Sequence, residues 1–121
     1  MMAKPPEQDT PALILHIDAA ERNIKKMGDY FRGKKSCLRA HTKIHKSPFL
    51  AHKQVAAGSR GITCAKLGEA EAMAWSGITD ILIANEIVSE HKLSRLARLA
   101  KCCKLSVAVD DSQTQSSCPT F

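Results

Sequence analysis

Aromatic residues are scarce in this chain, at 4% of 121 residues. Its core must therefore be built mostly from Leu, Ile, Val and Ala side chains. The few aromatic residues do not alternate with the basic ones, so the sequence offers no row of platforms on which the bases of a nucleic acid could stack. A formal net charge of +6 attracts phosphate, but a small phosphorylated ligand explains that charge as well as a polymer does. We therefore expect no nucleic-acid partner.

Long hydrophobic runs and paired cysteine motifs are also missing. Nowhere do the roughly 18 consecutive apolar residues of a membrane span occur, and residues 1–9 lack the apolar core of a signal peptide. The five cysteines are an odd number without a CxxC pair, which is typical of reduced thiols rather than of a zinc site or a disulfide framework. These absences predict a cytoplasmic protein without a membrane segment and without a metal site of its own.

What the sequence does contain is an alternation of strand-like and helix-like segments. Apolar residues make up 44% and charged residues 25%, which is ordinary for a single globular domain. We expect strands at 12–17, 37–43, 61–67, 80–85 and 105–109, and helices at 20–32, 48–57, 68–76 and 89–103. This spacing predicts an α/β protein with right-handed crossovers between parallel strands.

Two α/β architectures fit this pattern. One is a partial (β/α)8 TIM-like barrel, with one strand preceding the barrel and about four barrel strands after it. The alternative is a five-stranded doubly wound parallel sheet, which suits a chain of this length. A response-regulator-like version of that sheet would need acidic residues after its first and third strands. Asp18 could serve the first strand, but Lys66 stands near the end of the third.

The alternation stops after residue 109. Residues 112–121 show no apolar periodicity and contain a proline, which is typical of a disordered tail. We expect a polar lead at 1–9, a structured unit at 10–111 and a disordered tail at 112–121. Because a domain usually covers its last strand with a further element, the pattern suggests a truncated product or an altered reading frame.

Residues 39–46 are the strongest candidates for chemistry. They place Arg39, His41, His45 and Lys46 around Lys43, where a strand-like stretch gives way to a helix start. Nearby positive charges disfavour the charged form of a lysine amine, which can then attack an aldehyde, and the same cations can hold a phosphate. These residue types point to pyridoxal phosphate bound as a Schiff base. The alternative is a solvated basic surface on a non-enzymatic phosphate-binding or interaction protein.

Five motifs follow one another along the chain, at 10–13 (TPAL), 39–46 (RAHTKIHK), 54–58 (QVAAG), 61–71 (GITCAKLGEAE) and 80–85 (DILIAN). Together they resemble the N-terminal part of the D-threonine aldolase and D-serine dehydratase family, within the alanine-racemase-like, fold-type III pyridoxal phosphate enzymes. The resemblance implies a TIM-like barrel and a lyase acting on a small D-amino acid. It identifies 10–111 with the N-terminal half of the barrel domain, and 12–17 with a segment that pairs with a separate C-terminal β domain.

The resemblance also implies roles for single residues. It makes Lys43 the catalytic residue that carries the cofactor as an internal aldimine and takes part in proton transfer at the substrate Cα. Five further residues are expected to bind the cofactor with it: Arg39, His41, His45, Lys66 and Asn85.

The chain departs from the family's pattern at two positions and in extent. Ala40 stands where the family usually has proline, and Ile44 where threonine is common. The family's phosphate-binding loops, the residues that stack on the pyridine ring and a divalent metal site belong to a second half that this chain does not contain. We therefore expect the chain alone to be inactive, and its open barrel edges to favour a homo-oligomer or a complementing chain.

Overall fold

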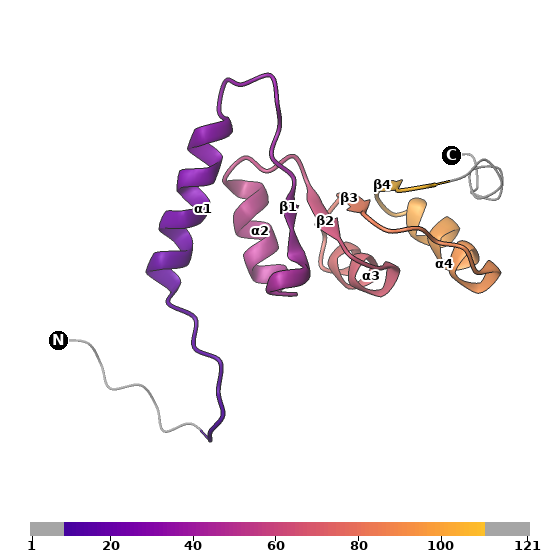
Figure 1. Ribbon diagram of the computed structural model, residues 1–121, viewed down its shortest axis with the longest axis horizontal. Helices are drawn as coiled ribbons and strands as arrows, with labels where there is room; N and C mark the ends of the chain where they lie inside the picture. Colours follow the sequence, from indigo (N-terminus) through magenta and orange to yellow (C-terminus); the bar gives the residue numbers. More distant parts are fainter. Residues whose placement is uncertain (1–8, 111–121) are drawn as a thin grey trace.

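A computed structural model of the chain describes residues 9–110 (Figure 1). Its centre is a four-stranded, wholly parallel sheet. The elements in chain order are α1 (Ile17–Phe31), β1 (Ala40–His41), the 3-10 helix η1 (Thr42–Ile44), α2 (Pro48–Ala56), β2 (Ile62–Cys64), α3 (Leu67–Trp75), β3 (Asp80–Ile83), α4 (Glu90–Ala100) and β4 (Lys104–Val107). Nearly all of the predicted lead at 1–9 and the whole predicted tail at 112–121 lie outside the described residues.

The order of the strands separates the two predicted architectures. Neighbours in the sheet are also successive in sequence, in the order β1-β2-β3-β4. A doubly wound sheet reverses its strand order at a switch point, whereas a barrel keeps the sequential order. The chain therefore has the predicted α/β fold of a partial TIM-like barrel, and not the five-stranded doubly wound alternative. Figure 1 shows the helices α2, α3 and α4 in the same sequential order beside the strands that they connect.

The core lies between the sheet and its helices. Side chains alternate across a strand, and one face of the sheet carries the fully buried Ile62, Cys64, Ile81 and Ile83. The helical side chains in the same core are Ala51 from α2, Leu67, Ala70 and Met73 from α3, and Leu96 and Leu99 from α4. This arrangement leaves the other face of the sheet as the interior of the partial barrel.

That interior face carries a row of four residues. His41, Thr63, Leu82 and Ser106 are register partners across the four strands. Thr63 is buried and Leu82 half-buried, whereas His41 and Ser106 are exposed. Within residues 9–110 the interior face is therefore open to water at both ends of the row.

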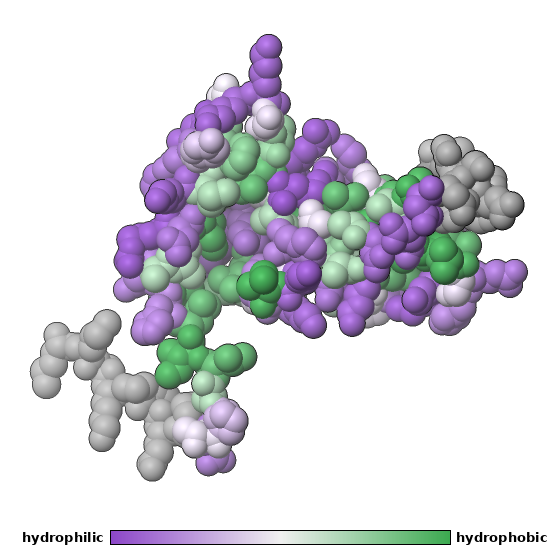
Figure 2. Space-filling model, in the orientation of Figure 1, coloured by the Kyte–Doolittle hydropathy of each residue, from purple (hydrophilic) through white to green (hydrophobic). Residues whose placement is uncertain are grey.

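The first predicted strand is wrong. Residues 12–16 form no helix or strand, Leu13 and Ile14 are exposed, and α1 begins at Ile17 rather than at residue 20. A strand needs a hydrogen-bonded neighbour, and none of the four described strands lies beside this segment. Asp18 in the first turn of α1 favours the earlier helix start. In Figure 2, hydrophobic atoms gather on this segment where it leaves α1.

The second predicted strand is shorter than expected, because only two of the residues 37–43 pair with β2 before the chain turns into η1. The start of α2 is confirmed: the Ser47 hydroxyl accepts a hydrogen bond from the Leu50 N–H, and Pro48 occupies the first turn. Gly58, with φ of 109°, follows its end, as predicted. Among the described helices, none combines the length and apolar character needed to cross a membrane.

Candidate functional site

Three of the predicted site residues follow the carboxyl ends of neighbouring strands. Lys43, Lys66 and Asn85 each lie two residues beyond the last residue of β1, β2 and β3, respectively. The carboxyl ends of parallel strands meet at one edge of a sheet, which in barrel enzymes is the edge that carries the active site. The fold therefore brings these three residues to a common edge, called the carboxyl edge below.

Lys43 lies in the middle of η1, and its side chain is exposed. Its backbone N–H donates a hydrogen bond to Nδ1 of His41 over 3.2 Å. The backbone N–H groups of His45 and Lys46 both donate to the Thr42 carbonyl, over 3.2 Å and 2.7 Å. These bonds close a tight turn, and the Lys43 amine is presented from that turn rather than from a strand.

The two histidines beside Lys43 occupy different places. His41 ends β1 on the interior face and is exposed. His45 turns toward α2, where its Nδ1 accepts a hydrogen bond from the Ser47 N–H over 3.0 Å and its Nε2 lies 3.3 Å from Oε1 of Gln54. An amide N–H can only donate, so the neutral His45 ring carries its proton on Nε2 and donates it to Gln54. His45 therefore braces the turn against α2.

Sequence reasoning missed Thr42, the residue before Lys43. Its side chain is only 1% exposed, and its Oγ1 donates to the Thr63 carbonyl over 3.1 Å. The same hydroxyl lies 3.5 Å from Sγ of Cys64. Burial raises the pKa of the Cys64 thiol, and the hydrogen bond with Thr42 offsets that rise only in part. A single threonine between His41 and Lys43 belongs to no periodic pattern that would predict its burial.

Lys46 ends the turn in a left-handed conformation, with φ of 49°. Residues other than glycine hold this conformation only where their surroundings fix it. The Lys46 Nζ lies 3.9 Å from Oε1 of Glu69 on α3, and the mostly buried Glu69 accepts a hydrogen bond from the Ala65 N–H over 2.9 Å. Lys46 therefore links the turn to the start of α3.

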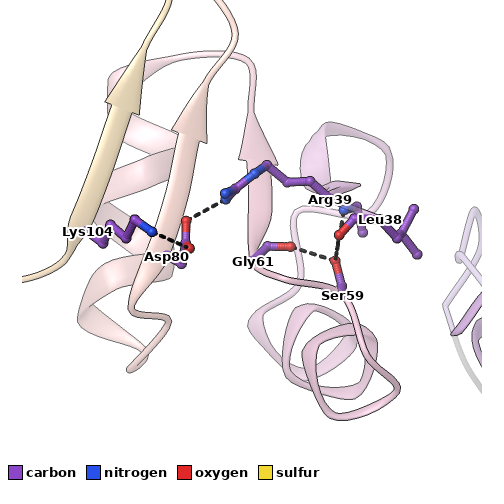
Figure 3. A network of polar contacts seen from close by, with 7 residues as sticks. Leu38, Arg39, Ser59, Gly61, Asp80 and Lys104 are labelled. Carbon is purple, nitrogen blue, oxygen red and sulfur yellow. Dashed lines mark hydrogen bonds and ion pairs between the residues drawn. The ribbon is translucent and has the colours of Figure 1, made fainter. Parts of the chain in front are cut away.

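Arg39 lies at the opposite edge of the sheet (Figure 3). Its Nη1 donates to Oδ1 of Asp80 over 2.7 Å, and Asp80 and Lys104 are the first residues of β3 and β4. The guanidinium passes over Gly61, where an added Cβ would lie 2.6 Å from Nη1. The structure therefore does not bring Arg39 to the carboxyl edge with Lys43. Instead, Arg39 ties the start of β1 to β3 across β2.

The Asp80 carboxylate is held in its ionised form by its neighbours. Burial on its own would raise the pKa of Asp80, but the hydrogen bond from Arg39 and the charges of Arg39, Lys104 and Arg60 together outweigh that effect. The net pKa of Asp80 therefore lies below its usual value. The amino-terminal face of a TIM-like barrel generally serves stability rather than catalysis, and this ion pair lies on that face.

Two hollows in the described residues lie away from Lys43. One, of about 300 Å³, is lined by α1, β1 and α2, including Met27 and Leu38. The other, of about 460 Å³, lies between α3 and α4 and includes Trp75 and Arg98. Lys43 is not among the residues that line either hollow. No group of three or more His, Cys, Asp or Glu side chains within residues 9–110 is placed to hold a metal ion.

Comparisons with known proteins identify relatives of the chain. No protein-family model matches the chain. The chain is 48% identical over 109 residues to 3-hydroxy-D-aspartate aldolase from Paracoccus denitrificans, covering 88% of this chain and 28% of that protein. The structure of D-threonine aldolase from Filomicrobium marinum matches with a TM-score of 0.87 and 48% identity, over 90% of this chain and 30% of that one. The chain is related to the N-terminal part of the D-threonine aldolase family.

A third relative in the D-threonine aldolase family is D-threo-3-hydroxyaspartate dehydratase from Delftia sp. HT23, whose structure matches with a TM-score of 0.82 and 36% identity over 91% of this chain. The relatives thus include both aldolases and a dehydratase named for D-amino acids. The family resemblance carried by the five sequence motifs is confirmed. The chain spans little more than a quarter of the length of these relatives.

Proposed function

We propose that Lys43 is the residue through which this chain binds pyridoxal phosphate, as the N-terminal half of a barrel in a lyase acting on a D-amino acid. One observation carries the proposal. Lys43 presents an exposed amine from a closed turn at the carboxyl edge of a partial barrel, and that barrel is related to D-amino acid aldolases and a dehydratase.

The residues at the carboxyl edge suit the chemistry of this cofactor. Its aldehyde needs an accessible amine, and Lys43 is exposed. Its phosphate needs positive charge, which the exposed Lys66 supplies at the same edge. Asn85 uses its Oδ1 to accept the Glu86 N–H over 3.0 Å, so its side-chain NH2 is left to donate to the ligand. These groups fit an anionic aldehyde.

Two of the predicted cofactor-binding residues take supporting roles in this proposal. Arg39 is engaged with Asp80 at the other edge, and His45 is engaged with Ser47 and Gln54. Both hold the segment around Lys43 in place. His41 remains a cofactor-binding residue in this proposal, because its Nδ1 accepts the Lys43 N–H and it lies at the end of the interior row.

Lys43 and His41 then have separate tasks. When bound, pyridoxal phosphate supplies an electron sink for the substrate Cα. Lys43 would hold the cofactor through its Nζ at the aldehyde end, and as a free amine Lys43 can accept a proton from the Cα of the amino acid. His41, whose Nδ1 is occupied, has an Nε2–H that can donate to a carboxylate or a phenolate oxygen at the edge.

Turnover needs the interior face to be covered. His41 and Ser106 on that face are exposed, and water at a site weakens its electrostatic interactions. We therefore propose that the 121-residue chain binds the cofactor but turns over D-threonine and D-serine only when a second copy or a complementing chain covers this face.

A titration with pyridoxal phosphate, followed by visible absorbance, tests the role of Lys43. The wild-type chain and Lys101→Ala, which removes an exposed lysine from the C-cap of α4, should both develop a saturable band. Lys43→Ala should lose the band, or bind at least about tenfold more weakly. Equal binding by Lys43→Ala would contradict the proposal, and salt-sensitive binding without a band would favour a non-enzymatic phosphate-binding protein. Circular dichroism checks that each variant is folded.

A further inference from the structure

We infer that Thr42 is a positioning residue, whose hydrogen bond to the Thr63 carbonyl fixes where the turn presents the Lys43 amine. The inference rests on the proposed function of Lys43 and extends it to a neighbour that does not touch the ligand.

The first argument is the shortness of β1. β1 consists of only two residues, and they pair with β2 in the register Ala40 to Ile62 and His41 to Thr63. Beyond His41 the backbone enters η1, and the N–H groups of His45 and Lys46 close the turn on the Thr42 carbonyl. The Thr42 hydroxyl donates to the Thr63 carbonyl over 3.1 Å. A side chain therefore attaches the chain to β2 one residue beyond the last ladder pair.

The second argument is burial. Thr42 is 1% exposed, whereas the residues on either side of it, His41 and Lys43, are both exposed. Thr42 is therefore the point at which this turn enters the protein interior. The Thr63 residue that accepts its hydrogen bond is itself only 8% exposed, so this hydrogen bond lies in the protein interior, where it is stronger than a bond exposed to water.

The other attachments of the turn act at its far end. His45 contacts Gln54 over 3.3 Å, and the exposed Lys46 lies 3.9 Å from Glu69. Both come after Lys43, and an exposed ion pair at that separation contributes little. Without the Thr42 hydroxyl the turn can pivot about these later contacts, which would spread the positions of the Lys43 amine. A ligand binds more weakly to an amine that occupies many positions than to an amine held in one position, because binding must then also order the amine.

Two substitutions at Thr42 separate the effect of the hydroxyl group from the effect of side-chain volume. Thr42→Val keeps the volume and removes the donor, and Thr42→Ser keeps the donor. Ile81→Val is the stability control, because Ile81 is a fully buried β3 core residue and pairs with Ile62 and Leu105 rather than with the turn. We measure pyridoxal phosphate affinity from the visible band, the melting temperature, and amide hydrogen exchange at His45 and Lys46 in the cofactor-free chain.

Thr42→Val should weaken cofactor affinity about fivefold and speed exchange at both amides by a similar factor. Thr42→Ser should match the wild type. Ile81→Val should lower the melting temperature and leave affinity and exchange at the turn unchanged.

Two results would overturn the inference: wild-type exchange and affinity in Thr42→Val, or the same losses in Ile81→Val as in Thr42→Val. If the wild-type chain itself bound no cofactor through Lys43, the proposed function would fail. The exchange rates would still decide whether Thr42 holds the turn.

Discussion

Among single residues, Asp80 carries the negative charge that pairs with Arg39 and Lys104 at the amino-terminal edge of the sheet. Its side chain is 17% exposed, accepts a hydrogen bond from Arg39 and lies 3.7 Å from Lys104. Its pKa is lower in the folded chain than the ordinary value of 3.8. Folding therefore favours the ionised form. The contribution of Asp80 to stability is fully present above the unfolded-state pKa and is lost as the pH falls through the lower folded-state pKa.

Asp80→Asn should lower the free energy of unfolding at neutral pH by about 1.5–3 kcal/mol, because the half-buried Arg39 loses a charged hydrogen-bond acceptor. Stability of the variant should also depend less on pH as the pH falls below the ordinary Asp pKa of 3.8. Urea unfolding at several pH values measures both effects. Lys104→Ala is the control and should cost less than about 1 kcal/mol, because Lys104 is 64% exposed. A variant with wild-type stability and pH dependence would contradict this role of Asp80.

The residues around Lys43 were predictable only where strand ends placed them. Lys43, Lys66 and Asn85 reach a common edge because each lies at the carboxyl end of a strand-like stretch. Those stretches are visible in the sequence, although each observed strand ends two or three residues earlier than predicted. Arg39 lies only four residues before Lys43, yet β1 runs between them and separates them to opposite edges. The inward turn of Thr42 depends on the Thr63 carbonyl of another strand, which no local pattern reveals.

Among the structural elements, β1 depends most on contacts beyond its own ladder. Its two ladder pairs are supplemented at one end by Arg39 and at the other by Thr42. The Arg39 contact requires Gly61, because an added Cβ there would meet both the Asp80 backbone oxygen and the Arg39 Nη1. Gly61 thus makes room for the tie between β1 and β3.

Gly61→Ala should destabilise the chain by about 1–3 kcal/mol, because the crowded atoms include backbone, which moves only with strain. Gly68→Ala is the matched control, since an added Cβ at Gly68 in α3 meets nothing within 4 Å. That control should stabilise the chain by about 0.5–1 kcal/mol. Thermal unfolding of both variants gives the comparison, and equal effects at the two glycines would show that the close approach at Gly61 has no cost.

The helices were more predictable than the strands. The predicted helices at 48–57, 68–76 and 89–103 differ from α2, α3 and α4 by at most three residues at either end, because caps and apolar periodicity are local signals. The segment at 12–17 has the composition of a strand, but a strand also requires a neighbour, and composition cannot supply one.

For the whole molecule, the sequential strand order is the most informative feature. It places the carboxyl ends of β1, β2 and β3 side by side and leaves an open interior face in residues 9–110. The match to D-threonine aldolase from Filomicrobium marinum covers 90% of this chain but only 30% of that structure. This part of the fold therefore presents an open edge with an exposed amine. The proposed chemistry depends on Lys43, which carries that amine.

The most direct test of that dependence is to find where the cofactor attaches. The 121-residue chain is incubated with pyridoxal phosphate, reduced with borohydride and digested, and the adduct is located by mass spectrometry. We expect a single dominant adduct on Lys43, at a stoichiometry near one per chain. Labelling spread over exposed lysines such as Lys66 and Lys101, with Lys43 no more modified than they are, would contradict the account.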